Sequence, residues 1–384
     1  MSQLRALFIS PMGTREKNGM MQRQHQTLST LCELYDGAVD VLSLGASPDA
    51  LEKWLQASGL HAKVIKGLYA SLARFNTSLW YGGGVVLCNK LRAAHRFRFP
   101  LRTPIPRSWI DRYEIIVCYY PWGYNLLRLD HAGGKVVMDL ADIMADRHER
   151  IGTRRWISLH ADDERKILRS ASRCMAISVE DSREFEHRYG VQPSVVPFTP
   201  PEWRQLATLV TDERPSRVGY MGAPSYHNEI VLRLLARLEF LECLSAAGIE
   251  LVVAGGICDT VDDSVLQSLE RGGARVLGRI RSIVDFYAQI STLVNPVGPS
   301  TGAKIKSIEA LMAGRKLITT RWGADESLTE AFSSQIQYIE WPIDSGALGE
   351  LTVKLLRSTA PVDFGAIRKY ADESAQALGS ILSK

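Results

Sequence analysis

Short apolar runs alternate with longer segments of helical periodicity along most of this chain. The runs are continuous, which is typical of strands that helices cover on both faces of a parallel sheet. In the first half the pattern predicts strands at residues 5–10, 38–44, 115–120, 135–139 and 174–178. It predicts helices there at residues 20–34, 48–58, 157–170 and 179–189.

The same pattern starts again after a proline-dense stretch at residues 195–201, VVPFTPP, which cannot be helical. The second half predicts strands at residues 217–220, 250–254, 276–279, 293–294 and 336–340, and helices at 229–241, 282–289, 303–313, 345–358 and 363–383. Strand–helix alternation in both halves predicts two doubly wound α/β domains. We expect them at residues 1–198 and 199–364, with residues 365–384 as a candidate to pack back on the first domain.

Composition agrees with a globular protein of this size. The chain has 384 residues, of which 46% are hydrophobic and 23% are charged, so it is long enough for two or three cores. Its net charge of +4 does not by itself indicate a nucleic-acid-binding protein.

The cysteines and the amino terminus indicate a cytoplasmic protein. Six cysteines are scattered without a C-x-x-C pair, which predicts reduced core residues and neither disulfides nor a zinc site. The start, MSQLRALFISPMG, has too short an apolar run for a signal peptide. No run of eighteen apolar residues occurs, so we expect no membrane-spanning helix.

Residues 61–112 differ from the rest of the chain because they hold ten Lys or Arg residues against one acid, Asp111. Their aromatic residues are Tyr69, Phe75, Trp80, Tyr81, Phe97, Phe99 and Trp109. Basic residues beside aromatic side chains favour an anionic membrane surface or a polyanionic partner. No nucleic-acid-binding module accompanies them, so we expect a peripheral membrane association and no nucleic acid. The alternative is a solvated basic face over an ordinary core.

The stretch at residues 291–320 combines a strand, a loop rich in turn formers and a helix. Gly302, Lys306, Glu309 and Ala313 follow one another at steps of four, three and four, which places them on one helix face. Backbone amides, the helix dipole and a lysine suit a diphosphate, and a carboxylate one turn further suits sugar hydroxyls. The alternative is a crossover helix whose Lys306–Glu309 pair is a solvated ion pair.

The first domain also has candidate ligand residues. Gly19 and Arg23 lie where the first predicted strand feeds a loop and a helix, at the ligand-facing corner of an α/β sheet. Asp139, Asp142 and His148 follow the carboxyl end of another predicted strand. A plain surface loop is the alternative at the first corner, and an acidic first helical turn is the alternative for Asp142.

Several enzyme classes are excluded by absent motifs. The dinucleotide fingerprint G-x-G-x-x-G, the P-loop, the nucleophile elbow and H-E-x-x-H do not occur. The missing motifs therefore argue against a simple dehydrogenase, kinase, hydrolase or zinc protease. A cleft between two such domains is still a favoured ligand site.

The order of motifs in the second half resembles the retaining, nucleotide-sugar-dependent "group 1" family of GT-B glycosyltransferases. The similar elements are residues 218–222 with Asn228, residues 251–255, residues 276–279 with Phe286 and Tyr287, residues 294–296, and residues 306–310 with 313–314. The resemblance covers about residues 215–325 and extends to the first half in outline. It implies the GT-B fold, with two Rossmann-like domains facing each other across a cleft.

The resemblance also implies roles for individual residues. Glu309 would hold the ribose hydroxyls, and the amides of Thr301 and Gly302 would hold the diphosphate with Lys306. Further donor-binding candidates are Gly222, Asn228, Gly278, Arg279 and Lys304. Many family members carry a glutamate where this chain has Thr301, and no Arg/Lys pair follows Gly222, so the later lysines must neutralise more of the phosphate charge.

The implied function is transfer of a sugar, hexosyltransferase-like, from a nucleotide-sugar donor to a glycan or lipid-linked acceptor, with retention, in cell-surface polysaccharide or glycolipid assembly. Lys306 and Asp142 are the catalytic candidates, and Gly19, Arg23, Asp139 and His148 are the acceptor-side candidates. Neither a metal nor another cofactor is expected, because fixed cations do the work of a metal. The alternatives are a GT-B-fold nucleotide-sugar epimerase and an inactive nucleotide-sugar-binding paralogue.

Overall fold

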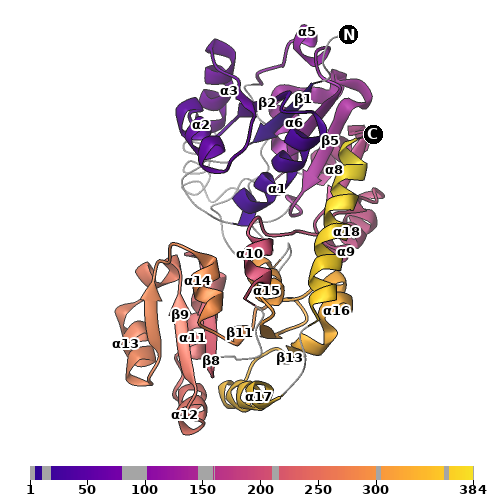
Figure 1. Ribbon diagram of the computed structural model, residues 1–384. Coiled ribbons are helices and arrows are strands. Elements are labelled where there is room, and N and C mark those ends of the chain that lie inside the picture. The colour runs from indigo at the N-terminus through magenta and orange to yellow at the C-terminus, as the bar shows by residue number, and fades with distance from the viewer. Residues whose placement is uncertain are drawn as a thin grey trace. The chain divides into compact units, whose positions relative to one another are not determined.

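The computed structural model describes residues 5–10, 19–79, 102–145, 159, 161–209, 216–299, 304–358 and 363–383. The chain divides into two compact units, shown in Figure 1. The N-terminal unit consists of Met1–Pro197 with Ser374–Lys384, and the C-terminal unit consists of Phe198–Glu373. The division after Pro197 falls within the proline-dense stretch, and the second division falls inside the last helix.

The N-terminal unit is built on a seven-stranded parallel sheet with the order β3-β2-β1-β4-β5-β6-β7. Its strands are β1 (Ala6–Ser10), β2 (Val39–Ser43), β3 (Lys63–Val64), β4 (Ile115–Tyr119), β5 (Val136–Leu140), β6 (Arg173–Ala176) and β7 (Ser194–Val195). Its helices are α1 (Gly19–Leu34), α2 (Pro48–Ala57), α3 (Leu68–Ser78), α5 (Arg107–Ile110), α6 (Pro121–Leu127), α8 (Ala161–Ser170), α9 (Val179–Tyr189) and the end of α18 (Phe364–Leu382).

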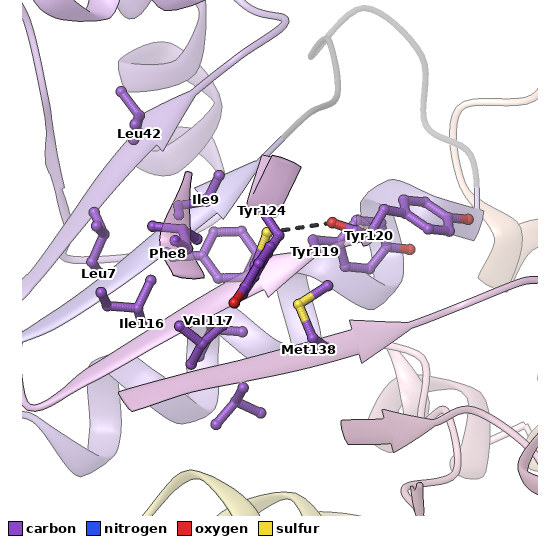
Figure 2. Close-up of a cluster of buried hydrophobic side chains, with 14 of the residues drawn as sticks. Leu7, Phe8, Ile9, Leu42, Ile116, Val117, Tyr119, Tyr120, Tyr124 and Met138 are labelled. Carbon is purple, nitrogen blue, oxygen red and sulfur yellow. Dashed lines mark hydrogen bonds between the residues drawn. The ribbon is translucent and has the colours of Figure 1, made fainter. Parts of the chain in front are cut away.

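The core of this unit lies around β1 and β4, whose residues are buried on both faces because helices cover both sides of the sheet. Figure 2 shows this cluster, with Tyr119 and Tyr120 at the carboxyl end of β4. The last turns of α18 join the same core through Leu378 and Leu382. In addition, Ser374 Oγ donates to the Pro197 carbonyl oxygen at 2.7 Å.

The C-terminal unit has a six-stranded parallel sheet with the order β10-β9-β8-β11-β12-β13. Its strands are β8 (Arg217–Met221), β9 (Glu250–Ala254), β10 (Arg275–Gly278), β11 (Thr292–Asn295), β12 (Lys316–Thr319) and β13 (Ile336–Tyr338). Its helices are α10 (Trp203–Ala207), α11 (Tyr226–Leu235), α12 (Leu238–Ala246), α13 (Asp263–Arg271), α14 (Ile283–Ala288), α15 (Ile305–Met312), α16 (Glu326–Phe332), α17 (Ser345–Arg357) and the start of α18. Two parallel α/β sheets confirm the predicted fold class.

One predicted helix, at residues 229–241, is wrong as a single element. The structure has two helices here, and Arg237 between them has an extended backbone. The buried side chains of α11 (Val231, Leu232 and Leu235) repeat nine residues later in α12 (Phe240, Leu241 and Leu244). Nine residues correspond to about half a turn of rotation on a straight helix, which would point the two sets in opposite directions. The break lets both sets reach the core.

No helix within the described ranges is both long enough and apolar enough to cross a bilayer. The five cysteines in these ranges, Cys32, Cys118, Cys174, Cys243 and Cys258, are free, and the first and fourth are half-buried while the others are buried.

Candidate active site

The order of strands in the C-terminal unit defines a switch point between β8 and β11. From β8 the chain proceeds to β9 on one side, while β11 and β12 extend the sheet on the other side. Open α/β sheets bind ligands beyond the carboxyl ends of the two strands at such a point. The turn after β8 contains Gly222 and leads to α11, which holds Asn228, whereas β11 leads to α15 with Lys306 and Glu309. The topology therefore brings these four predicted donor residues to one place.

Glycines lie at the ends of β8, β9 and β10, where the backbone turns. Gly255 has a φ of +101°, and a Cβ placed on it would lie 2.3 Å from the carbonyl oxygen of Gly222. The amide of Gly255 donates to the carbonyl oxygen of Gly278 at 2.7 Å, and Gly278 has a φ of +63°. Because these positions carry no side chains, the local backbone turns tightly here.

Lys306 extends from the first turn of α15 to the turn that follows β8. Its Nζ donates to Asn228 Oδ1 at 2.8 Å and lies 4.8 Å from the centre of the Tyr220 ring. The side chain is half-buried, and no carboxylate among the described residues forms an ion pair with it. A half-buried cation that rests on an amide oxygen and a ring face is suited to bind an anion.

Asn228 is held in place by every polar atom of its side chain. Its Nδ2 donates to the Ala223 carbonyl oxygen at 2.8 Å, and its Oδ1 accepts from Lys306 and from the Tyr220 hydroxyl at 3.2 Å. Ser225 begins the helix that carries it, because Ser225 Oγ accepts from the Asn228 amide at 3.3 Å. The geometry therefore makes Asn228 a residue that positions Lys306, while direct contact with a donor stays a prediction.

Glu309 lies one turn after Lys306 and is buried, with 2% of its surface exposed. The Tyr287 hydroxyl lies 3.1 Å from Glu309 Oε2 and 3.0 Å from the Lys306 carbonyl oxygen. Burial, together with the charge of Glu309, raises the pKa of Tyr287 well above its usual value, so this hydroxyl stays a donor. The alternative of a solvated Lys306–Glu309 ion pair is wrong because the carboxylate faces the interior.

The charge state of Lys306 is sensitive to its surroundings. Burial lowers the pKa of Lys306 from 10.5 to about 7. The negative charge of Glu309 opposes this lowering, and the positive charge of Lys304 adds to it. A bound anion would favour the charged form of the lysine, so binding of the anion and of a proton are coupled at this site.

The other predicted donor residues lie around this centre. Lys304 directly precedes α15 and is half-buried. Arg279 is largely exposed and its guanidinium forms an ion pair with Asp259, an interaction that stabilises a surface only weakly. Thr301 and Gly302 lie outside the described residues, so their predicted contacts with a diphosphate stay predictions.

In the N-terminal unit, the structure pairs two acceptor-side candidates with each other. Arg23 on α1 and Asp139 on β5 are fully buried, and Arg23 Nε lies 3.2 Å from Asp139 Oδ1. Arg23 Nη1 also donates to the Val196 carbonyl oxygen at 3.1 Å, and the Thr27 hydroxyl donates to Asp139 at 2.7 Å. This is the geometry of an internal ion pair that joins α1, β5 and the end of the unit. Their acceptor contacts stay predictions that the burial does not favour.

The other first-domain candidates are placed as follows. Gly19 is the first residue of α1, and Asp142 is buried two residues beyond the end of β5. His148 lies outside the described residues, as do Trp80, Tyr81, Phe97 and Phe99 of the basic segment.

With this geometry in place, comparison with known families addresses the C-terminal unit. The sequence matches no curated protein. A family model described as "Glycosyl transferases group 1" matches residues 215–357, which include β8, α11, β11 and α15. The C-terminal unit therefore matches the group 1 glycosyltransferases over most of its length. The family predicted from the motifs is therefore confirmed.

Solved structures extend the likeness in fold to the whole chain. HepE from Anabaena, in complex with UDP and glucose, has a TM-score of 0.61 and 13% identity, covering 99% of this chain and 98% of its own. WaaG, a glycosyltransferase involved in lipopolysaccharide biosynthesis, has a TM-score of 0.59 and 15% identity, covering 98% and 99%. A putative UDP-N-acetylglucosamine 2-epimerase from Listeria monocytogenes has a TM-score of 0.56 and 10% identity, covering 99% and 95%.

At such low identities these likenesses establish the fold, and the predicted two-domain GT-B fold is confirmed. A putative epimerase shares it, so the fold alone does not select a reaction.

Sequence reasoning assigned no role to two tyrosines of the candidate site. Tyr220 ends the apolar run of β8 and places its ring against Lys306, and Tyr287 follows Phe286 in α14. The sequence feature that could have indicated them is a tyrosine at a position predicted to be buried, because a buried tyrosine hydroxyl needs a hydrogen-bond partner. The partner itself is visible only in the folded structure.

Proposed function

We propose that this glycosyltransferase moves a sugar from a nucleotide-sugar donor to an acceptor hydroxyl, with retention, in cell-surface polysaccharide or glycolipid assembly. The observation that carries the proposal is the half-buried amino group of Lys306 at the β8–β11 switch point, with no carboxylate paired to it among the described residues. A donor diphosphate has the complementary charge. The UDP-and-glucose complex of HepE supports a nucleotide sugar as donor.

In this proposal the donor diphosphate leaves while Lys306, Lys304 and the start of α15 stabilise its growing negative charge. The amides of Thr301 and Gly302 contribute to the same anion site. Glu309 holds the ribose hydroxyls, which requires that it exchange part of its contact with the Tyr287 hydroxyl for the sugar.

The remaining donor contacts come from the glycine-rich strand ends. Gly278 and Arg279 line the base, and Gly222 lets the backbone approach the donor. Lys304 and Lys306 are fixed cations that take the place of a metal ion at the diphosphate. We therefore propose that neither a metal nor another cofactor is required. Full activity in the presence of EDTA would support this point, and loss of activity restored by a divalent cation would reject it.

The acceptor hydroxyl attacks the anomeric carbon on the face that the diphosphate leaves. The new bond joins the acceptor oxygen to that carbon, the bond from carbon to diphosphate oxygen breaks, and the acceptor proton passes to the departing diphosphate. Asp142 is the proposed first-domain residue for contact with the acceptor or the sugar. Retention predicts a product with the anomeric configuration of the donor, which NMR of the product would test.

We further propose that the acceptor is linked to a lipid and that residues 61–112 dock the enzyme on an anionic, cytoplasmic leaflet. The basic composition of this segment supports the proposal, as does the role of WaaG in lipopolysaccharide biosynthesis. Vesicle binding should fall with added salt and when Arg92, Arg96 and Arg98 are neutralised. Binding that is indifferent to both changes would reject this part.

Nucleotide-sugar epimerisation is the second candidate, because a putative epimerase shares the fold. An inactive nucleotide-sugar-binding protein is the third, motivated by Thr301 where many relatives have a glutamate. Isomerisation of a UDP-sugar without an acceptor would favour the epimerase, whereas donor binding without transfer to any acceptor would favour the inactive protein.

The test of the donor site is calorimetric titration with UDP-, GDP- and dTDP-sugars. Lys306→Ala and Glu309→Ala should abolish donor binding while circular dichroism shows an unchanged fold. Lys369→Ala is the matched control, since this lysine is exposed on α18 and forms a surface ion pair with Glu373. Unchanged donor affinity in both site variants would reject the assignment.

A further inference from the structure

Helix α3 of the N-terminal unit has an apolar face that points away from the protein. Leu68, Leu72, Phe75 and Leu79 are 77%, 46%, 58% and 44% exposed. Their spacing of four, three and four residues confines them to a stripe about 60° wide at roughly 100° per residue. No other helix in the described part of the chain exposes more than two large apolar side chains.

The opposite face of α3 explains why the stripe cannot turn inward. Ala70, Ala73 and Thr77 are buried and pack the helix toward β2, near the edge of the sheet. These small residues lie about half a turn from the stripe, because positions three and four apart share a face of a helix. The helix, labelled in Figure 1, therefore satisfies its core contacts with small side chains, while its large ones are exposed.

The charged side chain on α3 itself is positive, and Lys66 just before the helix pairs with Asp49 and Glu52 of α2. Helix α3 contains no Asp or Glu, and Arg74 lies on it. The described segment that begins at residue 102 is hydrogen-bonded to α3 through Thr103. Its Oγ1 accepts from Asn76 Nδ2 at 2.6 Å, and its carbonyl oxygen accepts from the Tyr69 hydroxyl at 2.9 Å. This tie places exposed Arg102 next to the helix.

The same side carries more cations and an aromatic pair. The rings of Tyr69 and Trp109 lie 5.2 Å apart, and exposed Arg107 precedes that tryptophan by two residues. Neither Arg102 nor Arg107 forms an ion pair with a carboxylate of the described residues. By sequence, Lys90 and Arg92 continue the basic character between the two described segments.

We propose that α3 inserts its apolar stripe into the interface of an anionic lipid bilayer, with the surrounding arginines at the level of the lipid phosphates. An apolar stripe of Leu and Phe flanked by cations is the pattern of helices that lie in a membrane interface. A second copy of the chain fits less well, because a two-fold contact of this face with itself brings the same cations together. Nucleic acid offers no partner for the apolar side chains.

This inference rests on the membrane docking proposed above and is independent of sugar transfer. It assigns the apolar part of the binding energy to four residues, whereas residues 61–112 as a whole supply the charge. The docking depends on both, so vesicle binding requires anionic lipid and the apolar stripe together.

The test is flotation of the full chain with phosphatidylcholine vesicles with and without phosphatidylglycerol. Leu72→Ser and Phe75→Ser should each weaken binding to the anionic vesicles about tenfold or more, the effect of removing one buried large apolar side chain from a lipid contact. Leu238→Ser replaces a leucine at the start of α12 that is 65% exposed, more than Leu72 or Phe75, and this variant should bind like the wild type. The apolar exchange Leu72→Phe with Phe75→Leu should preserve binding.

Unchanged flotation of the two serine variants would overturn the inference, as would equal binding to neutral and anionic vesicles. Self-association in sedimentation velocity that the serine variants abolish, without vesicle binding, would assign the stripe to a second copy and overturn it too. Donor titration of the serine variants separates the two proposals. Lost vesicle binding with normal donor binding supports the inference, and it does so even if no sugar is transferred.

Discussion

The coupling of donor binding to the protonation of Lys306 yields a quantitative prediction. Burial lowers the pKa of this lysine to about 7 in the unliganded site, so it is about nine-tenths charged at pH 6 and about one-thirtieth charged at pH 8.5. The diphosphate binds the charged form and holds its proton. Donor affinity should therefore be nearly constant below pH 7 and fall about tenfold per pH unit above it, which amounts to about 30-fold between pH 6 and pH 8.5.

The assay is calorimetry of nucleotide-sugar binding in buffers of different ionisation enthalpy, which counts the protons taken up. We expect close to zero protons per donor at pH 6 and about one at pH 8.5. Lys306→Arg is the control, because a guanidinium stays charged over this range and its variant should bind with a flat pH profile. A flat profile in the wild-type enzyme, or the same slope in Lys306→Arg, would refute the reasoning.

Three further outcomes test the packing around the candidate site and the Arg23–Asp139 ion pair. Asn228→Asp should weaken donor binding, because a carboxylate 2.8 Å from the Lys306 amine competes with the diphosphate. It should also move the loss of affinity to higher pH, because the carboxylate keeps the amine charged, and the same calorimetry measures both effects. Arg23→Met should destabilise the N-terminal unit by about 3–5 kcal/mol in urea unfolding, since it leaves Asp139 buried without a cation, and Asp139→Leu added to it should recover part of the loss. Gly255→Ala should lower the melting temperature more than Gly248→Ala, because both have positive φ but only the first places a Cβ against a backbone oxygen, at 2.3 Å.

Local pattern was sufficient for most of the secondary structure. Continuous apolar runs identified β1, β2, β4, β5, β8 and β9, because strands covered on both faces need apolar side chains on both. The pattern failed at the α11–α12 break, where a run of good helix formers hides a half-turn shift of the buried face. Helix propensity alone would allow a continuous helix there. A continuous helix could not bury both sets of side chains, so the helix breaks.

The sequence by itself determined which residues share a face. The spacing of Lys306 and Glu309 sets both on one side of α15, and the positions of Gly222 and Asn228 follow from the strand–turn–helix pattern after β8. The sequence pattern did not predict α3, and the spacing of Leu68, Leu72 and Phe75 forms a stripe only because the structure makes this segment a helix.

Only the tertiary structure decided what those faces meet. It joins Lys306 to Asn228 across 78 residues and Arg23 to Asp139 across 116, because parallel sheets place β8 beside β11 and β5 within reach of α1. Burial among these neighbours lowers the pKa of Lys306. Burial also makes Arg23 and Asp139, two predicted acceptor-side residues, an internal ion pair. The spacing of residues along the chain specifies the direction in which their side chains point from a helix or strand. Whether those side chains are buried or paired with a charge depends on the order of strands in the sheet, which no local pattern encodes.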